Sequence, residues 1–394
     1  MSSAPSSGRQ HDGALVDLAE LPPAPPTAVA VIESIATGAP GRVVPQDAAA
    51  ARVAELFNLD AEQRERVTRV FEKTRIDSRR MAIDPLDPEF DEFRRAAGTV
   101  RDRMGLFYAH AAPLAVEVAG RAVAGVEGGA EAIGLLVFVT STGFIAPGVD
   151  VAVVRGLGLS PSVSRLVVNF MGCAAAMNGL RTASDYVRSH PGRKALVVCI
   201  EMCSVNAVFA GDVNDVIISS LFGDGCGAVV VGAGQVQQQL APGRIVIRET
   251  FSRLLDAAED GIVLGVNHNG VTCELSENLP AYIFDGVDPV ITGVLADLEL
   301  RKSDVDLWAI HPGGPKIIEQ SARSLGIPPS AAAHSWDVLA RFGNMLSVSL
   351  LFVLEAMKTS VAEPDSGGEP CTGVAFSFAP GVTVEGFVFD IVRH

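Results

Sequence analysis

The sequence predicts an α/β fold, in which strands buried on both faces alternate with helices. Three observations indicate it. The runs 133–142 and 194–204 are apolar almost throughout and have the length of strands. Segments of helical character, such as 103–126, separate runs of this kind. Hydrophobic residues make up 48% of the 394 residues and charged residues 20%, which is ample material for a large core.

The first part of the chain supplies most of the predicted strands. A strand and turn are expected at 27–40, followed by helices at 47–59 and 61–74. The segment 164–191 begins as a short apolar strand and turns at Gly172 into a long helix. A further strand is expected at 220–232. This alternation favours a sheet of largely parallel strands.

The last third of the chain repeats the theme. Its predicted elements are a helix at 279–299, a strand at 306–314, helices at 315–325 and 344–358, and paired strands at 372–378 and 382–392. The similar order suggests two duplicated halves, 27–240 and 241–394, although no repeat of fixed period is visible. Residues 1–26 are rich in Ser, Gly, Pro and Ala, and we expect them to form a flexible tail.

Charge and composition exclude several classes of protein. The net charge of −15 argues against nucleic-acid binding, because phosphate contacts need a basic face. No apolar run reaches the length of a membrane span, and no secretory signal opens the chain, so a cytoplasmic protein is expected. The six cysteines form no CxxC pair and the histidines lack zinc-ligand spacing, so neither a disulfide framework nor a metal site is expected.

Cys173 is the first candidate for chemistry. It follows a predicted strand and lies in the first turn of a predicted helix, where the helix N-terminus stabilises a thiolate and lowers the pKa of the thiol. Gly172 allows the sharp turn, and the small residues after Cys173 leave room for a substrate. Taken alone, Cys173 fits an ordinary buried cysteine at least as well.

Two further residues fit a site that uses Cys173. His311 ends an apolar strand and opens the turn His-Pro-Gly-Gly-Pro, a position where α/β folds place active sites. Asn344 precedes a long apolar helix, and its neutral amide could donate a hydrogen bond to an oxyanion. The structural alternatives are a strand-end histidine held by the backbone and a helix N-cap asparagine.

The motifs that contain these residues resemble one family. NFMGCAAAMNGL, WAIHPGGPKIIEQ, RFGNMLSVS and SFAPGVTVEG are similar, in this order, to motifs of the type III polyketide synthases, and the resemblance extends from about residue 27 to the C-terminus. It is closer to the mycobacterial-type long-chain alkylpyrone synthases than to the plant chalcone synthases. It implies a thiolase-like fold with αβαβα layers, a homodimer, and Cys173, His311 and Asn344 as the catalytic triad.

The resemblance also implies the chemistry. Cys173 takes the acyl group of an acyl-CoA, and His311 and Asn344 hold the carbonyl of malonyl-CoA while it loses CO2. The resulting carbanion extends the acyl chain by two carbons. We expect the extended chain to cyclise to an alkyl-α-pyrone. No cofactor is required.

A basic helix face is the expected binding site for CoA. Arg66, Arg69 and Lys73 fall at i, i+3 and i+7 and therefore share one face of the helix 61–74. These positions match the basic CoA-binding helix of the family. A solvated helix face with no ligand is the alternative.

Departures from the plant enzymes indicate the substrate. Phe222 matches the first of two phenylalanines that guard the junction of CoA tunnel and cavity, whereas Cys273 stands at the second position. Ala146 replaces a larger residue that reaches into the cavity of the partner subunit in plant relatives, and Thr142 and Cys203 are small side chains at further cavity positions. These small residues favour a long aliphatic acyl chain.

Three other functions remain open at this point. A ketoacyl synthase of the initiating type uses the same three residues for a single condensation. A cysteine hydrolase of the papain type also uses Cys, His and Asn. A non-catalytic acyl-CoA binder could share the scaffold. The spacing of HPGGP and RFGNM and the basic helix favour the polyketide synthase.

Overall fold

The computed structural model describes residues 28–90, 99–206, 220–235, 240–267, 270–361 and 369–393. The expected N-terminal tail, 1–26, lies outside the described residues.

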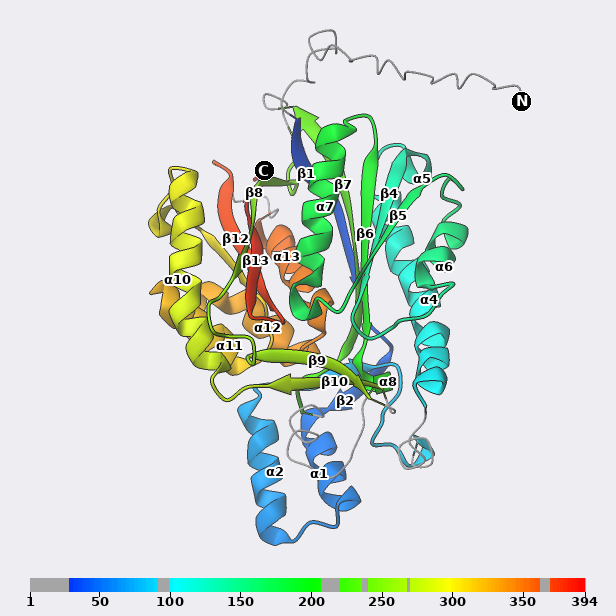
Figure 1. Cartoon of the computed structure of the whole chain (residues 1–394), viewed down its shortest axis with the longest axis vertical. Coiled ribbons are helices and arrows are strands. Elements are labelled where there is room, and N and C mark those ends of the chain that lie inside the picture. The colour runs from blue at the N-terminus through cyan, green and yellow to red at the C-terminus, as the bar shows by residue number, and fades with distance from the viewer. Residues whose placement is uncertain are drawn as a thin grey trace, which may run out of the picture.

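A nine-stranded sheet runs through the molecule (Figure 1). Its strand order is β11-β12-β13-β8-β1-β7-β6-β4-β5. In chain order, the strands are β1 (Ala28–Gly38), β4 (Ile133–Thr140), β5 (Ser164–Asn169), β6 (Lys194–Met202), β7 (Asp224–Gln235), β8 (Ile245–Leu254), β11 (Leu307–Ile310), β12 (Cys371–Ala379) and β13 (Thr383–Ile391). The apolar runs of the sequence predicted all of these strands except β8.

The sheet is mixed, so the expectation of largely parallel strands is wrong. β4 pairs in parallel with β5 and β6, and β11 pairs in parallel with β12, but the other neighbours are antiparallel. Only the three residues 380–382 connect β12 to β13, which is too short for the crossover that parallel strands need. Strand direction depends on such connections and on pairing across the chain, which the apolar runs do not encode.

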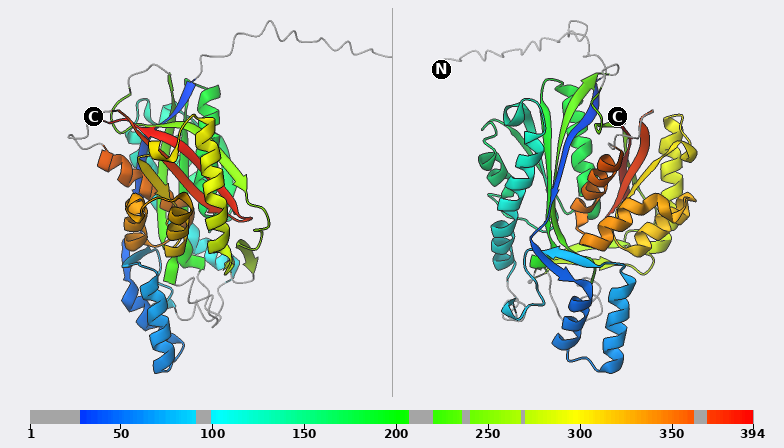
Figure 2. Two further views of the ribbon diagram at one scale, coloured as in Figure 1. Left: turned by 90° about the vertical axis from the view of Figure 1, so that its left-hand side faces the viewer. Right: turned by 180° about the vertical axis from the view of Figure 1, so that it is seen from behind.

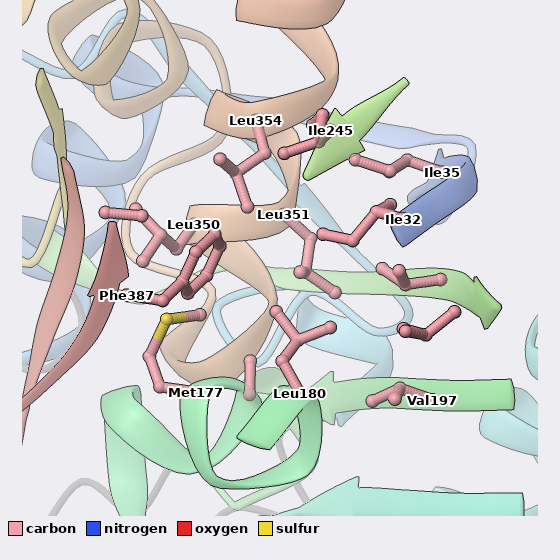
Figure 3. Close-up of a cluster of buried hydrophobic side chains, with 14 of the residues drawn as sticks. Ile32, Ile35, Met177, Leu180, Val197, Ile245, Leu350, Leu351, Leu354 and Phe387 are labelled. Atoms are coloured by element: carbon pink, nitrogen blue, oxygen red, sulfur yellow. The ribbon is translucent and has the colours of Figure 1, made fainter. Parts of the chain in front are cut away.

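The sheet has two parts, β11-β12-β13-β8 and β1-β7-β6-β4-β5, which are joined by a short pairing and enclose a helical layer. β1 pairs with β8 only from Ala30 to Ile32. Helices α7 (Ala175–Ser189) and α13 (Ser349–Val361) lie between the two parts, and their apolar side chains meet those of both (Figure 3). The labelled residues of this core are Ile32, Ile35, Met177, Leu180, Val197, Ile245, Leu350, Leu351, Leu354 and Phe387.

Further helices cover the outer faces of the sheet (Figure 2). On one side α4 (Val100–Ala124) packs against β1, β6 and β7 and against α6 (Val149–Gly156). On the other side lie α10 (Leu279–Asp297), α11 (Pro315–Leu325) and α12 (Ala333–Phe342), which pack over β11, β12 and β13. The layers are therefore αβαβα. Two short helices, α5 (Gly129–Ala132) and α8 (Cys203–Asn206), complete this body.

Helix α10 is the one helix among the described residues that is long and apolar enough to cross a membrane, with a mean hydropathy of 1.3. Its buried residues recur at every fourth position from Leu279 to Leu295, which is the stripe of a helix packed on a core. This stripe belongs to the same apolar cluster as Trp308 and Phe376 of the sheet. Packing in the outer layer thus accounts for the buried stripe of α10.

A small helical arm projects from one end of the body (Figures 1 and 2). It contains β2 (Arg42–Pro45), α1 (Gln46–Leu56), α2 (Ala61–Lys73) and β3 (Ser78–Met81), and its core is built around Val53 and Phe71. The hairpin of β9 (Ile262–Asn267) and β10 (Gly270–Leu275) crosses the body at the same end. The two predicted arm helices are confirmed, whereas the sequence did not reveal β2, β3, β9, β10, α6 or α12.

Candidate active site

Cys173 lies in a 3-10 turn, Gly172–Ala174, between the edge strand β5 and the central helix α7. The turn needs left-handed backbone at Gly172, where φ is +55°, so the expected role of this glycine is confirmed. A Cβ atom at Gly172 would also approach Pro380 to 3.3 Å. The turn is anchored by the amide of Gly172, which donates a hydrogen bond of 3.1 Å to the hydroxyl of Ser141.

His311 follows the last residue of β11, as predicted. Its side chain is buried, and its backbone amide donates to the carbonyl of Phe376 on the neighbouring β12. Neither ring nitrogen has a hydrogen-bond partner among the described residues. Gly313 packs against the ring, since a Cβ atom there would lie 3.0 Å from Cδ2 of His311. The backbone therefore fixes the position of the imidazole and leaves its nitrogens available.

The side chain of Asn344 supports the turn before α13 and reaches the Cys173 thiol. Its Oδ1 accepts a hydrogen bond of 2.9 Å from the amide of Leu346, which opens a 3-10 turn before α13. This bond fixes the side chain so that Nδ2 points away from the turn. Nδ2 lies 3.2 Å from the carbonyl of Gly313 and 3.9 Å from the Sγ atom of Cys173.

One pocket brings the three predicted catalytic residues together. Cys173, His311 and Asn344 all line the same pocket. Most of the remaining lining is apolar and comes from the hairpin, α10, α11 and the end of β12: Ile262, Leu264, Leu275, Leu279, Ile317 and Phe378. A pocket with a thiol, an imidazole and an amide in apolar surroundings suits a substrate with a reactive carbonyl and an apolar chain.

Burial determines the resting protonation of the pair. It raises the pKa of the Cys173 thiol well above its ordinary value; the neighbouring Cys273 adds to this effect, and the hydrogen bond from Asn344 opposes it. Burial also lowers the pKa of His311 to about 3. Burial of both groups therefore favours a neutral thiol and a neutral imidazole. The expected lowering of the thiol pKa by the helix start is outweighed by burial.

Two of the predicted substrate residues also line this pocket, namely Phe222 and Cys273. Phe222 lies just before β7 and pairs with Asn344 as an isolated bridge between the two segments. Cys273 lies on β10, and burial raises the pKa of its thiol to about 12. The side chain at position 273 thus faces the cavity from the hairpin.

The other three predicted substrate residues lie outside the lining of this pocket. Thr142 is buried, and its hydroxyl donates to Glu201 and accepts from the amide of Met202. Cys203 is half-buried at the start of α8, and burial raises the pKa of its thiol. The nearby Asp224, Glu201, Cys173 and Cys273 add smaller effects in the same direction. Ala146 is exposed, beside the exposed Ile145.

The three predicted CoA-binding residues lie on α2 of the projecting arm. Arg66, Arg69 and Lys73 are all exposed. Arg66 pairs with Glu62 one turn before it, and Nη2 of Arg69 lies 3.7 Å from Oε1 of Glu65. Ion pairs of this exposed i, i+4 kind are weak and can exchange for a phosphate.

Glu201 is a further site residue that sequence reasoning missed. Its buried carboxylate accepts hydrogen bonds from the amides of Ser141 and Thr142 and from the hydroxyl of Ser347, the last at 2.6 Å. It therefore holds both the loop that anchors the turn of Cys173 and the turn that follows Asn344. Burial raises the pKa of Glu201 to about 7, against the effect of these hydrogen bonds. The available signal was a lone carboxylate within the apolar run 194–204.

Two family models match nearly the whole chain. The N-terminal domain of chalcone and stilbene synthases matches residues 25–235, and the C-terminal domain matches residues 247–393. The chain belongs to the chalcone and stilbene synthase family. It is a type III polyketide synthase with a thiolase-like fold, as its motifs led us to expect, and hence an acyltransferase that performs decarboxylative condensation. Enzymes of this family need no cofactor.

Individual relatives agree with this assignment. The chain is 69% identical over 388 residues to the alpha-pyrone synthesis polyketide synthase-like Pks18 of Mycobacterium tuberculosis, covering 98% of this chain and 97% of that protein. Among solved structures, PKS-I of the brown alga Ectocarpus siliculosus superposes with a TM-score of 0.85 at 37% identity, covering 93% of this chain and 99% of the other. The C-terminal type III domain of Steely1 from Dictyostelium gives 0.83 at 28% identity, covering 92% and 99%.

Within the described ranges, no three His, Cys, Asp or Glu side chains form a group that could hold a metal ion.

Proposed function

We propose that this synthase loads a long-chain aliphatic acyl group from acyl-CoA onto Cys173, extends it with malonyl-CoA and cyclises the product to an alkyl-α-pyrone. The observation that carries the proposal is the unpartnered imidazole of His311, which lines one apolar pocket with Cys173 and Asn344. A buried ring without a partner is costly unless a ligand supplies one. The 69% identity to an alpha-pyrone synthase supports the ring that is formed.

Loading needs a thiolate and a leaving group. The proton of the Cys173 thiol passes to His311 as the sulfur attacks the thioester carbon of acyl-CoA. The tetrahedral intermediate collapses with loss of the CoA thiolate, which takes the proton back from His311. Because burial favours the neutral pair, the thiolate forms only as it reacts.

Extension uses two hydrogen-bond donors, the side-chain amide of Asn344 and the imidazole of His311. The thioester carbonyl of malonyl-CoA accepts hydrogen bonds from Nδ2 of Asn344 and from His311. As the bond to the carboxylate carbon breaks, CO2 leaves and the electron pair forms an enolate on that carbonyl. The enolate carbon attacks the acyl thioester on Cys173, the Cys173 thiolate departs, and a β-ketoacyl-CoA is formed. The extended chain then returns to Cys173 with release of the CoA thiol, and a second condensation of the same kind gives a 3,5-diketoacyl-CoA. In the final step the enol oxygen on C5 attacks the thioester carbonyl carbon, closes the six-membered pyrone and releases CoA.

The small side chains around the pocket support a long aliphatic starter. Cys273 stands where an aromatic ring would narrow the cavity, and Cys203 lies nearby at the start of α8. The hairpin contributes Ile262 and Leu264, which suit an alkyl chain better than a polar one. We also assign Thr142 and Ala146 to the acyl path.

The basic face of α2 supports CoA as the carrier. Arg66, Arg69 and Lys73 are exposed on the arm at the end of the body where the hairpin crosses (Figure 1). Phosphate groups are strong acceptors for such side chains. The acidic chain thus carries a local basic face for a phosphorylated substrate.

Homodimer formation is part of the same proposal. β5 is an edge strand, and its Leu166 and Val167 are 40% and 47% exposed in the single chain. An apolar edge strand of this kind invites pairing with a second copy. We assign the exposed Ala146 to the face that meets the partner subunit. A cytoplasmic location fits the six free cysteines, which persist in a reducing compartment. We further propose 27–240 and 241–394 as the two halves of the fold.

One assay tests the proposed activity. The protein is incubated with malonyl-CoA and a series of acyl-CoA starters from short to long, and the products are identified by mass spectrometry. Triketide or tetraketide pyrones from the long starters are expected. A single β-ketoacyl product on a carrier protein would indicate an initiating ketoacyl synthase, rapid release of free acid a hydrolase, and full product formation by a Cys173→Ala variant would make Cys173 dispensable.

A further inference from the structure

Arg79 is a buried cation next to the backbone of Phe222, a residue of the active-site pocket. It lies on β3 at the base of the arm, and its side chain is among the largest that are fully buried. Burial lowers the pKa of Arg79 to about 10, opposed by Asp84 and Asp224, so it stays charged at neutral pH. A buried charge is costly unless ion pairs and hydrogen bonds compensate for its lost hydration.

The guanidinium of Arg79 holds the segment that carries Phe222. Nη1 donates a hydrogen bond of 3.1 Å to the carbonyl oxygen of Phe222. Phe222 in turn forms the bridge with Asn344, whose amide donates to Leu221 at 2.8 Å and whose carbonyl accepts from Gly223 at 3.0 Å. One guanidinium thus fixes the backbone that carries Phe222 and Asn344, two residues of the pocket.

The aliphatic stem of Arg79 packs on the residue before Asn344. Gly343 has φ +69°, and a Cβ atom there would lie 2.9 Å from Cγ and 3.1 Å from Cδ of Arg79. A smaller side chain at position 79 would leave this backbone unsupported. The guanidinium and the aliphatic stem of Arg79 therefore both support the backbone that positions Asn344.

Arg79 also contacts the helices of the arm. Its Nε donates at 3.0 Å to the side chain of Gln46, the first residue of α1. The amide nitrogen of Gln46 donates to Thr74, directly after α2, and to the carbonyl of Ser220. A continuous path of hydrogen bonds therefore connects the end of the basic helix with the segment of Phe222.

We propose that Arg79 is a positioning residue that holds the Asn344 amide and the Phe222 ring in place and couples them to the helical arm. The inference rests on the proposed function, since it assigns Asn344 to decarboxylation and the arm to CoA. It predicts that loss of the guanidinium impairs the decarboxylation step more than acyl loading, because loading depends on Cys173 and His311, whereas the hydrogen bond of Arg79 holds the segment of Phe222 that pairs with Asn344.

The variant Arg79→Lys tests this inference. A single ammonium group cannot reproduce the two directed hydrogen bonds of Nε and Nη1. Misplacement of a catalytic group by about 1 Å can cost roughly 100-fold, so kcat for decarboxylation of malonyl-CoA should fall by about tenfold or more. Acylation of Cys173 by acyl-CoA, read as an increase in intact mass, should stay within about threefold of the wild-type rate.

Arg103→Lys is the matched control. Arg103 is also fully buried, its pKa is also lowered to about 10 by burial, and its Nη1 donates to the carbonyl of Val205 rather than to Phe222. Its replacement tests what loss of a buried guanidinium does to folding alone. The folded fraction of each variant is measured by thermal unfolding, and rates are expressed per folded protein.

Three results would count against the inference. A decarboxylation rate of folded Arg79→Lys within about twofold of the wild-type rate would overturn it. So would a result in which Arg79→Lys and Arg103→Lys both lose loading and decarboxylation to the same extent. If Arg79→Lys does not fold, Gln46→Glu replaces it: this variant keeps the guanidinium but removes the donor to Ser220, and unchanged decarboxylation would again overturn the coupling. Wild-type protein that neither loads nor decarboxylates would instead overturn the proposed function itself.

Discussion

The Nδ2 atom of Asn344 lies 3.9 Å from the Sγ atom of Cys173, although 171 residues separate the two in the chain. Cys173 precedes the central helix α7 and Asn344 precedes the central helix α13, so the contact joins the starts of the two helices that the sheet encloses. His311 reaches the same pocket from the end of β11. The fold thus brings together a thiol, an imidazole and an amide from three separate loops, which lie before α7, after β11 and before α13.

Removal of the Asn344 amide should impair decarboxylation selectively. We expect Asn344→Ala to lower kcat for malonyl-CoA decarboxylation by roughly 100- to 1,000-fold, the usual effect of losing one donor to a developing oxyanion. Acyl loading on Cys173 should fall much less, because there only the long contact from Asn344 to the sulfur is lost. CO2 release without a starter and intact mass with a starter measure the two steps. Asn278→Ala, at the exposed start of α10, is the control, and equal loss of both steps would contradict the assigned role.

A phenylalanine at position 273 should restrict the starter. The side chain at this position lines the pocket, so Cys273→Phe would fill space that an alkyl chain is proposed to use. The ratio of kcat/KM for long to short acyl-CoA starters should fall by about tenfold or more, the effect of a few lost methylene contacts. Glu274→Phe makes the same change at the neighbouring, exposed position of β10 and should leave the ratio unchanged. An unaltered ratio in Cys273→Phe would place the acyl path elsewhere.

Removal of the basic face of α2 should weaken CoA binding. In Arg66→Ala/Arg69→Ala/Lys73→Ala, we expect KM for acyl-CoA to rise by about tenfold with kcat nearly unchanged, because the cations bind ground state and transition state alike. Starters carried on a short pantetheine without the nucleotide should show no such change. Arg64 lies on the opposite face of the same helix, so Arg64→Ala is the control. Equal effects of the two variants would indicate a merely solvated face.

Glu201 should make stability depend on pH. Its pKa is raised to about 7 in the folded protein from 4.5, so the folded state keeps a proton that the unfolded state loses. The free energy of unfolding should therefore fall as pH rises from about 4.5 to 7, by about 3 kcal/mol in all, and level off above that range. Urea unfolding of wild type and Glu201→Gln across this range measures the difference. The contribution of Asp224, whose pKa is raised to about 6, is present in both proteins and cancels. Parallel pH profiles would contradict the assignment.

Local patterns in the sequence predicted the elements that position the site. The apolar runs marked β4, β6 and β12, and the turn at Gly172 marked the position of Cys173. β8 to β10 were not predicted, because their polar and glycine residues interrupt the alternation that a strand normally shows. Strand direction was predicted wrongly for a related reason, since it depends on pairing between distant segments.

The supporting residues were harder to find than the catalytic candidates. Cys173, His311 and Asn344 each stand at the end of a recognisable element, where motifs are conspicuous. Glu201 and Arg79 act from within elements, and their importance depends on burial and on partners such as Ser347 and Phe222 far away in the chain. No local pattern encodes those partners. Such residues emerge only when the three-dimensional contacts are known.

Intact mass spectrometry after incubation with a long-chain acyl-CoA alone tests the central claim most directly. Wild-type protein should gain the mass of one acyl group, located by proteolysis on the peptide that contains Cys173, and Cys173→Ala should gain none. Cys273→Ala, which removes the other thiol of the pocket, should gain the acyl group as wild type does. An adduct that persists in Cys173→Ala, or one that disappears only in Cys273→Ala, would contradict the account.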